Sequence, residues 1–409
     1  MEPLKDIRVL AVTVYLAGPF LSMSLARFGA EVIKIEMPGA GDAVRNMGPF
    51  AGPDGVHSER QSEADLSTKF IKRTQGAKSI TLNLKDADGK RMFLSLAQQA
   101  DVIVENLAPG SMRRLGLDYA ALSKVNPALI YCSISGYGQE GPYAHNPAHD
   151  HQIQAMSGMM DINGHADGPP TRVGVYVSDL VTPLYCCYSI MAALRHRDQT
   201  GEGQYLDASM MDTLATLMFM EPLEEAIEDG LPSRAGNDAR NGPSGLYHVA
   251  DGDVMITVTN DERWRKLCEG LDAPDLLADS RFASDTSRTA HIDALRAALQ
   301  TRFAGLSVQQ ALARLSKADV PVAPVRTLEE ALADRHYYER GTLVPMRHPQ
   351  RTEPLGDRVV VGFPVKFSRG PLPTLAPAPS LGMHNADVYG KLLGLDEPAL
   401  AALRKRGVI

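Results

Sequence analysis

The chain has 409 residues, 44% of them hydrophobic and 22% charged, which is ordinary for a soluble globular protein and long enough for two or three domains. Its net charge of -7 and isoelectric point of about 5.9 argue against a nucleic-acid partner or an anionic-membrane surface. The four cysteines have no metal-ligand spacing, the sequence shows no signal-peptide pattern, and the longest apolar run is too short for a bilayer, so we expect a cytoplasmic protein without a metal site.

Short apolar runs alternate with helical patterns over residues 1–135. Helical period and composition occur at residues 20–28 and 90–99. This alternation is typical of an α/β fold in which helices cover both faces of a parallel sheet, and it places ligands beyond the carboxyl ends of the strands. The strands are expected at residues 8–12, 31–35, 79–82, 101–104 and 129–133.

Gly/Pro turns follow the first two expected strands, at residues 17–19 (AGP) and 38–42 (PGAGD). Neither turn has the three-glycine spacing that lets a pyrophosphate sit on a helix N-terminus. A nicotinamide enzyme is therefore disfavoured.

A single carboxylate, Asp179, directly precedes the N-terminus of an apolar helix expected over residues 180–194. A basic run, a Gly-Glu-Gly turn and a strand-like stretch at residues 204–209 (QYLDAS) follow it. One interpretation is a helix N-cap, in which Ser178 or Asp179 accepts the backbone N–H groups that the first turn leaves unpaired. The other is a nucleophile or base that the helix dipole keeps ionised. The local sequence leaves both interpretations open.

The pattern changes after residue 212. A helical stretch is expected to about residue 228, and a polar segment rich in Gly and Asn follows at residues 229–243. Further on, the sequence indicates a hairpin that turns at residues 250–253, helices at 261–271, 289–303, 307–317 and 387–403, a strand at 320–325, and a β-like stretch at 341–368. We therefore divide the chain into a large α/β domain (1–215), a linker helix and loop (216–244), a smaller α/β domain (245–335) and a C-terminal segment that returns to the large domain (336–409).

Motifs spread over almost the whole length carry a family resemblance. They are VYLAGPFLSMSLARFGAEVIKIEMPGAGD (14–42), AKSITLNLKDADGK (77–90), ADVIVENLAPGSMRRLGLDY (100–119), SISGYGQEGPY (133–143), the block around Asp179 (172–212), GPSGLYHVADG (242–252) and APSLGMHN (378–385). In this order and spacing they resemble the class III CoA-transferases. That family includes formyl-CoA:oxalate CoA-transferase and the CaiB/BaiF-like carnitine and bile-acid CoA-transferases.

The resemblance implies that Asp179 is the catalytic carboxylate and that CoA passes from an acyl-CoA donor to a small carboxylic acid. Asp179 would attack the donor thioester to give a mixed anhydride, and the released CoA thiolate would convert that anhydride into an aspartyl–CoA thioester. The acceptor carboxylate would then attack this thioester. Such an exchange needs a carboxylate nucleophile, donors for the oxyanions and exclusion of water, with CoA as substrate and no permanently bound cofactor. Dicarboxylates such as oxalate, succinate, mesaconate or itaconate are the expected acceptors.

The family pattern also implies a set of residues that bind CoA. Lysine or arginine gives charge-assisted bonds to phosphates, and apolar side chains would line the other side of the slot. Glycine-rich loops would supply backbone N–H donors, with Gly242 and Gly245 as candidates near the substrate, although turn geometry explains each glycine equally well. The residues assigned to CoA are Leu16, Ala17, Leu82, Lys85, Asn106, Leu107, Arg114, Gly136 and Tyr137.

The chain departs from the family pattern at several positions. Met37 stands where the family can hold an arginine, which puts one phosphate or adenine contact in doubt, and Arg45 is a candidate substitute. Ser135 stands where a lysine can occur. The tail motif reads LGMH, with Met383, where the family usually has LGEH.

His149 opens an alternative function. α-Methylacyl-CoA racemases of the same superfamily use a His/Asp pair to move the proton α to a thioester, and His149 with Asp179 fits their pattern locally. The surrounding segments are more similar to transferases, so we keep the racemase as the second interpretation. In a transferase, His149 would cap the next helix or line the cleft. The second carboxylate of an acceptor would meet Arg172, Arg240 or His149.

The resemblance further implies a homodimer whose two chains are threaded through each other like linked rings. The active site would then lie where the large domain of one subunit meets the small domain of the other. Nothing in the composition indicates this arrangement, so it is an expectation from the family alone.

Overall fold

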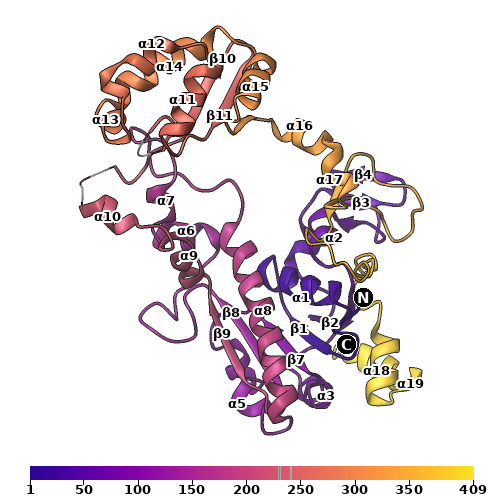
Figure 1. Cartoon of the computed structure of the whole chain (residues 1–409). Coiled ribbons are helices and arrows are strands. Elements are labelled where there is room, and N and C mark those ends of the chain that lie inside the picture. Colours follow the sequence, from indigo (N-terminus) through magenta and orange to yellow (C-terminus); the bar gives the residue numbers. More distant parts are fainter. Residues whose placement is uncertain (229, 231, 240–241) are drawn as a thin grey trace. The chain divides into compact units, whose positions relative to one another are not determined.

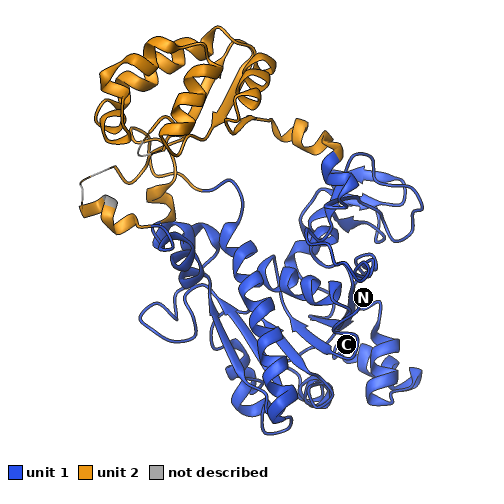
Figure 2. Cartoon of the chain, in the orientation of Figure 1, with its two compact units in different colours: residues 1–158, 173–221, 336–409 blue, residues 159–172, 222–335 orange. Residues whose placement is uncertain are grey.

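The computed structural model describes the chain except residues 229, 231, 240 and 241 and the side chain of residue 226. Figure 2 distinguishes two compact units. Unit 1 comprises Met1–Gly158, Val173–Glu221 and His336–Ile409, and unit 2 comprises Met159–Arg172 and Pro222–Arg335. The chain therefore leaves unit 1 twice and returns to it twice.

A six-stranded sheet lies within unit 1, and all its strand pairings are parallel (Figure 1). Most positions in its central strands are buried, as expected for a parallel sheet that is covered on both faces. The spatial order is β6 (Ala77–Thr81), β2 (Glu31–Glu36), β1 (Arg8–Val12), β7 (Val102–Glu105), β8 (Ile130–Ser135) and β9 (Tyr205–Ser209). The predicted α/β fold is confirmed.

Helices cover this sheet on both sides. On one face α1 (Ala17–Arg27) packs beside α8 (Val177–Thr200). On the other face, apolar side chains of α3 (Ala87–Ala97), α18 (Asn385–Leu393) and α19 (Glu397–Lys405) share one buried core with the strands. The Tyr389 hydroxyl also donates to the Thr81 carbonyl oxygen at 2.7 Å, which ties the C-terminal helices to β6.

Several predicted helices are divided or extended. The stretch predicted to be helical to residue 228 forms α9 (Met210–Met218) and α10 (Leu223–Glu228), because Pro222 between them disfavours helical geometry in the residue before it. Residues 387–403 form two helices, since Gly394 ends α18 with φ of 66°. Residues 289–303 are divided between α13 (Asp285–Ala290) and α14 (Ile292–Ala304).

α8 is longer than predicted, at 24 residues. By length and composition alone it is apolar enough to cross a membrane, so the expectation that this run is too short is wrong for the helix as it forms. The core helix of a soluble protein meets the same criterion. In unit 1, α8 packs against α1, β8 and β9.

Smaller sheets in unit 1 hold α2 (Thr68–Arg73) in place. Phe70 and Ile71 of α2 share a buried core with residues of both sheets, so segments from the two ends of the chain fix this helix. The sheets are β3 (Phe50–Gly52) with β4 (Gly55–His57) and β5 (Leu66–Ser67), and β13 (Leu343–Pro345) with β14 (Val359–Val361). The other short elements of unit 1 are η1 (Ala43–Asn46), α4 (Ser111–Leu115), α5 (Tyr119–Leu122) and α6 (Asp150–Met156).

Unit 2 contains a separate core around Trp264, built on an antiparallel sheet. The predicted hairpin is confirmed, because β10 (Gly245–Val249) pairs with β11 (Gly252–Ile256), and β12 (Val322–Pro324) adds a third strand. The remaining elements are α7 (Met159–Ile162), α11 (Asp261–Gly270), α12 (Pro274–Ala278), η2 (Ser280–Phe282), α15 (Val308–Lys317) and α16 (Leu328–Ala333), and α17 (Arg335–Glu339) lies at the boundary between the units.

Candidate active site

Asp179 lies in the first turn of α8 and does not cap the helix. The N-cap residue is Tyr176, which makes no side-chain cap. Instead, the buried Asp150 of α6 accepts from the Ser178 backbone N–H and from the Ser178 hydroxyl, each at 2.8 Å. The interpretation of Ser178 or Asp179 as the cap is therefore wrong. Within the described part of the chain the Asp179 carboxylate accepts no hydrogen bond, which leaves its oxygens open to a reaction partner.

The surroundings of Asp179 favour a reactive carboxylate. Its side chain is partly buried, and burial is the main cause that raises its pKa from 3.8 to about 6. The negative charge of Asp150 raises this pKa further, and the positive charge of Arg73 lowers it. Asp179 is therefore ionised at neutral pH but weakly solvated, and a weakly solvated carboxylate is a better nucleophile.

Arg73, the last residue of α2, supplies positive charge that acts on Asp179 through space. Its Nη1 donates to the Tyr15 carbonyl oxygen at 3.1 Å, and burial lowers the pKa of its guanidinium. Tyr15 has a positive φ of 63°, and its backbone N–H donates to the Asp42 carboxylate at 3.2 Å. Neither Arg73 nor Tyr15 is among the residues predicted from the sequence to have a role. Tyr15 adjoins the predicted Leu16, whereas no motif marks Arg73.

His149 belongs to the same neighbourhood of unit 1. It is the N-cap residue of α6, and its ring contacts the Tyr15 ring edge-on with centroids 5.8 Å apart. The next residue, Asp150, hydrogen-bonds Ser178, which precedes Asp179. The tertiary structure thus brings His149 and Asp179 into one region although 30 residues separate them in the sequence.

A cavity of about 460 Å³ opens beyond the carboxyl ends of β1, β2 and β6. Leu82, Lys85, Leu107 and Arg114, which the sequence assigned to CoA, all line it. Its other walls include Val12, Val14, Ile35, Met37, Leu84 and Leu115, together with Asp42. Lys85 and Arg114 thus place two positive charges in the wall of a largely apolar cavity. Asp42 connects this cavity to the Tyr15 backbone and so to the region of Arg73 and Asp179.

The remaining residues assigned to CoA do not line this cavity. Asn106 clamps the loop after β1, because its side chain accepts from the Val14 N–H at 2.9 Å and donates to the Val14 carbonyl oxygen at 3.0 Å. Leu16 and Ala17 follow that loop and are buried at the start of α1.

The two assigned residues after β8 pack against local neighbours. A Cβ on Gly136 would lie 2.3 Å from the Ala148 Cβ, so close packing requires glycine there. The Tyr137 ring contacts the Tyr143 ring with centroids 5.7 Å apart.

The candidates for the substrate side lie elsewhere in the chain. Gly242 and Gly245 belong to unit 2 and have positive φ values of 70° and 155°. Gly245 begins β10, where a Cβ would lie 2.4 Å from the Asp238 Oδ1 atom. Arg172 also belongs to unit 2. Arg240 lies outside the described residues.

Arg45 does not replace the arginine that the family can hold at position 37. Its guanidinium forms a bidentate pair with Glu36, at 2.8 and 2.7 Å, and lies 3.7 Å from the centroid of the Phe70 ring. The side chain is buried and also donates to the Pro379 carbonyl oxygen. Met37 itself lines the cavity, so an apolar side chain occupies that part of its wall.

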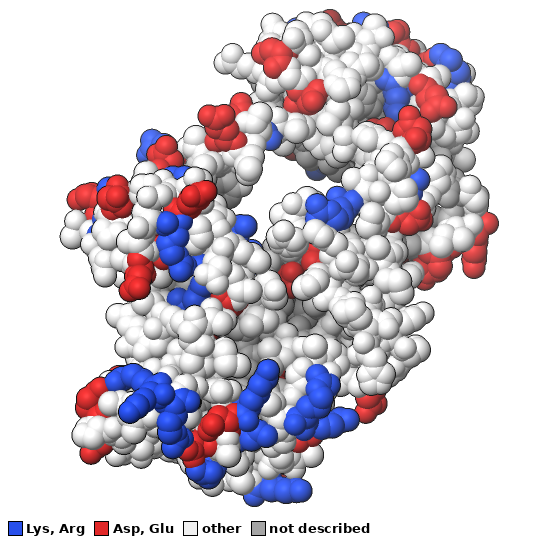
Figure 3. Space-filling model, turned by 180° about the vertical axis from the view of Figure 1, so that it is seen from behind, with Lys and Arg blue, Asp and Glu red and all other residues white. Residues whose placement is uncertain are grey.

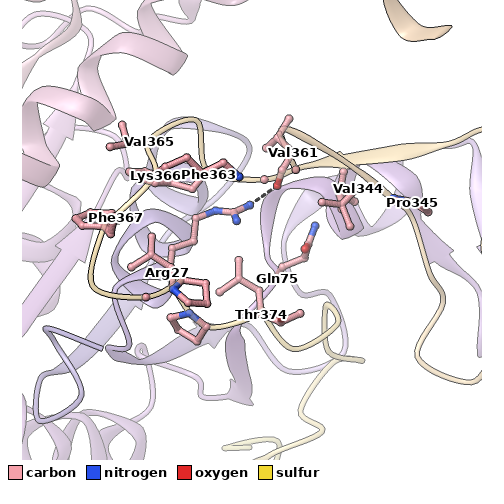
Figure 4. A pocket seen from close by; sticks show the side chains of 18 of the residues that line it. Arg27, Gln75, Val344, Pro345, Val361, Phe363, Val365, Lys366, Phe367 and Thr374 are labelled. Carbon is pink, nitrogen blue, oxygen red and sulfur yellow. Dashed lines mark hydrogen bonds between the residues drawn. The ribbon is translucent and has the colours of Figure 1, made fainter. Parts of the chain in front are cut away.

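A second cavity in unit 1, of about 580 Å³, lies between α1, α2 and the C-terminal segment (Figure 4). Arg27 crosses it and donates to the Val361 carbonyl oxygen, and Phe363 and Phe367 form part of its wall. No residue that the sequence analysis assigned to the site lines this cavity.

Acidic and basic side chains both occur on the face shown in Figure 3, and several basic side chains gather toward the lower end of that view. Among the residues that the structure describes, no group of His, Cys, Asp and Glu side chains could hold a metal ion.

The sequence pattern of the family described as CoA-transferase family III matches residues 4–385, and the chain belongs to this family. The chain is therefore a CoA-transferase. It is 34% identical over 410 residues to succinyl-CoA:glutarate CoA-transferase of Mus musculus, covering 100% of this chain and 91% of that protein. It is 38% identical over 369 residues to acetyl-CoA:oxalate CoA-transferase of Acetobacter aceti, covering 90% of this chain and 89% of the relative.

Solved structures show the same likeness. A CaiB/BaiF family protein from Brucella suis superimposes with a TM-score of 0.80 at 33% identity, covering 94% of this chain and 98% of that one. Rv3272 from M. tuberculosis gives a TM-score of 0.80 at 28% identity, with the same coverage. The predicted family membership is thus confirmed by sequence and by fold.

Proposed function

We propose that this enzyme transfers CoA from an acyl-CoA donor to a small dicarboxylic acid, with Asp179 as the nucleophile. The observation that carries the proposal is the state of Asp179: partly desolvated, ionised at neutral pH, and relieved of capping the helix by Asp150. The names of the relatives support the substrate class, because they include glutarate, oxalate and mesaconate as partners of the CoA transfer.

The proposed reaction proceeds through two covalent states of Asp179. The carboxylate attacks the donor thioester carbonyl, the C–S bond breaks, and a mixed anhydride and CoA thiolate result. The thiolate attacks the aspartyl carbonyl, which releases the donor acid and leaves an aspartyl–CoA thioester. The acceptor carboxylate repeats these steps in reverse order. A thioester and an acid become a thioester and an acid, so the exchange is nearly isoenergetic.

CoA itself is proposed to occupy the 460 Å³ cavity. Lys85 and Arg114 are placed to give charge-assisted bonds to its phosphates, and Leu82 and Leu107 offer apolar contact to the adenine. The Arg114 guanidinium is exposed and already donates to Ser111 Oγ at 2.9 Å, which orients it at the cavity. By resemblance we also propose a homodimer, twice the 44.3 kDa of one chain.

The racemase remains the second candidate because His149 and Asp179 share one region of unit 1. Inversion at the carbon α to a thioester needs one acid/base group on each face of that carbon, and His149 and Asp179 are the candidates for the two groups. The relatives described above bear the names of CoA-transferases, which favours the transferase.

Replacement of Asp179 tests the proposed function. Asp179→Ala is expected to abolish CoA transfer to every acid while CoA binding persists, because no other group can form the anhydride. Wild-type protein incubated with acyl-CoA should yield a hydroxylamine-sensitive adduct on the peptide that contains Asp179, detected by mass spectrometry. Asp198→Asn, an exposed substitution in the same helix, is the control.

Two outcomes would contradict the transferase. Turnover that survives in Asp179→Ala excludes Asp179 as the nucleophile. Exchange of an α-deuterium with solvent, without any protein adduct, would instead support the racemase.

A further inference from the structure

The cation next to the nucleophile comes from a part of the chain with no family motif. Arg73 ends α2, whose Phe70 and Ile71 are 1% and 2% exposed in the core that the small sheets share. The Thr74 hydroxyl closes the helix by donating to the Phe70 carbonyl oxygen at 2.7 Å. The base of the Arg73 side chain is therefore rigidly held.

The guanidinium of Arg73 keeps most of its hydrogen-bonding capacity. A guanidinium has five N–H donors, and only the bond to the Tyr15 carbonyl oxygen is formed among the described residues. Asp179 and Asp42 attract Arg73 electrostatically, yet no hydrogen bond or ion pair joins it to either carboxylate in the described part of the chain. Arg73 is thus a partly desolvated cation with N–H donors left to bind an anion.

The charge on Asp179 changes during the proposed reaction, and this change acts on Arg73. The free carboxylate partly compensates the guanidinium through space. Once Asp179 is acylated or carries CoA as a thioester, that negative charge is gone. An incoming dianion then meets a cation whose charge Asp179 no longer offsets, and a carboxylate–guanidinium contact in such a partly dry site is strong.

We propose that Arg73 binds the second carboxylate of a dicarboxylate acceptor and so selects dicarboxylates over monocarboxylates. This inference rests on the proposed function, in which Asp179 carries the CoA. Arg73 thus takes the role, binding of the second carboxylate, for which the sequence offered Arg172, Arg240 or His149. It lies in the same unit as Asp179, whereas Arg172 belongs to unit 2.

A different role would make Arg73 only an electrostatic support for Asp179. Its positive charge lowers the pKa of Asp179, so its loss would raise that pKa, leave less of Asp179 ionised and slow its attack on the donor thioester, whichever acceptor follows. If Arg73 also binds the second carboxylate, its loss lowers kcat/KM for dicarboxylates only, because monocarboxylates lack that group. The comparison of two acceptors that differ only in this group therefore separates the two roles.

The test uses the full chain, one acyl-CoA donor that lacks a free carboxylate, and succinate and butyrate as acceptors. In the wild type, kcat/KM should be higher for succinate. Arg73→Gln should lower kcat/KM for succinate by about 30- to 100-fold, mainly through KM, because a charge-assisted contact is lost. Any effect on butyrate should be much smaller. Arg73→Lys should recover part of the loss, since it keeps the charge but not the planar fork.

The neighbouring substitution Lys72→Gln is the matched control, because Lys72 is exposed on the same helix. It should leave both acceptors unchanged, and thermal unfolding should show that each variant is folded. An equal loss for succinate and butyrate in Arg73→Gln, or no preference for succinate in the wild type, overturns the assignment of Arg73. If the wild type transfers CoA to no acid in a broad panel, the proposed function fails as well.

Discussion

The proposed nucleophile is a single carboxylate, Asp179, and its environment sets the pH range in which it is ionised. Burial and the neighbouring Asp150 push the pKa of Asp179 upward, while Arg73 pushes it downward, with a result of about 6. In the proposed reaction the carboxylate attacks only when it is ionised. Asp179 suits that role because it is less well solvated than a surface aspartate yet charged at neutral pH.

We expect kcat/KM for the acyl-CoA donor to fall about tenfold per pH unit below about pH 6, because protonation removes the nucleophile. The sign follows from the raised pKa: activity is present above pH 6 and is lost as the pH falls through it. Arg73→Gln should move this acid limb to higher pH. A pH–rate profile of both proteins measures it, and a limb near pH 4 would contradict the raised pKa.

At the scale of elements, the contact between α6 and α8 prepares the nucleophile. Asp150 of α6 is 1% exposed and receives two hydrogen bonds from Ser178 of α8 and one from the Gln154 side chain at 2.6 Å. Because Asp150 accepts these bonds, the Asp179 carboxylate does not cap the helix. The buried Asp150 carboxylate thus joins α6 to α8, and its negative charge raises the pKa of Asp179.

Two substitutions separate these roles of Asp150. Asp150→Ala should lower the free energy of unfolding by about 2 kcal/mol, because it uncaps α8 and leaves buried donors unpaired. Asp150→Asn keeps an oxygen for Ser178, so it should cost less, and it should shift the acid limb of activity to lower pH by removing the repulsion of Asp179. Chemical denaturation and pH–rate profiles measure both. Equal stability of the two variants would refute the capping role.

At the scale of the whole molecule, residues from both ends of the chain build one unit. The core of the large sheet contains Val388, Tyr389 and Leu400 from the C-terminal helices together with strand residues near the N-terminus. The strand ends that line the cavity proposed for CoA are therefore supported by a tail more than 300 residues away in sequence.

Leu400→Ala should lower the free energy of unfolding of unit 1 by about 2–4 kcal/mol, because Leu400 is 2% exposed and its truncation leaves a cavity in the shared core. Met383→Ala is the matched control in the same unit, since Met383 is 62% exposed and should change stability by less than about 0.5 kcal/mol. Denaturant unfolding followed by circular dichroism measures both. Similar values for the two variants would show that the tail does not belong to the core.

The sequence was sufficient to predict those strands and turns that depend on neighbouring residues alone. Apolar runs predicted the strands of the parallel sheet, and the turn at residues 250–253 predicted the hairpin. Helix ends were less predictable where a single Pro222 or Gly394 divides a long periodic stretch, because periodicity continues across such a residue although the backbone does not. The motif order was enough to identify the family, and it singled out Asp179.

What the sequence by itself determined was the class of fold and the family, and it singled out Asp179 as the candidate nucleophile, because periodicity and motif order are properties of the chain alone. Only the tertiary structure decided how Asp179 is prepared. Asp150 takes over the cap, and Arg73 reaches the site from a helix more than 100 residues away in sequence. Desolvation, repulsion and attraction at one carboxylate depend on distances in space, and spacing along the chain does not fix those distances.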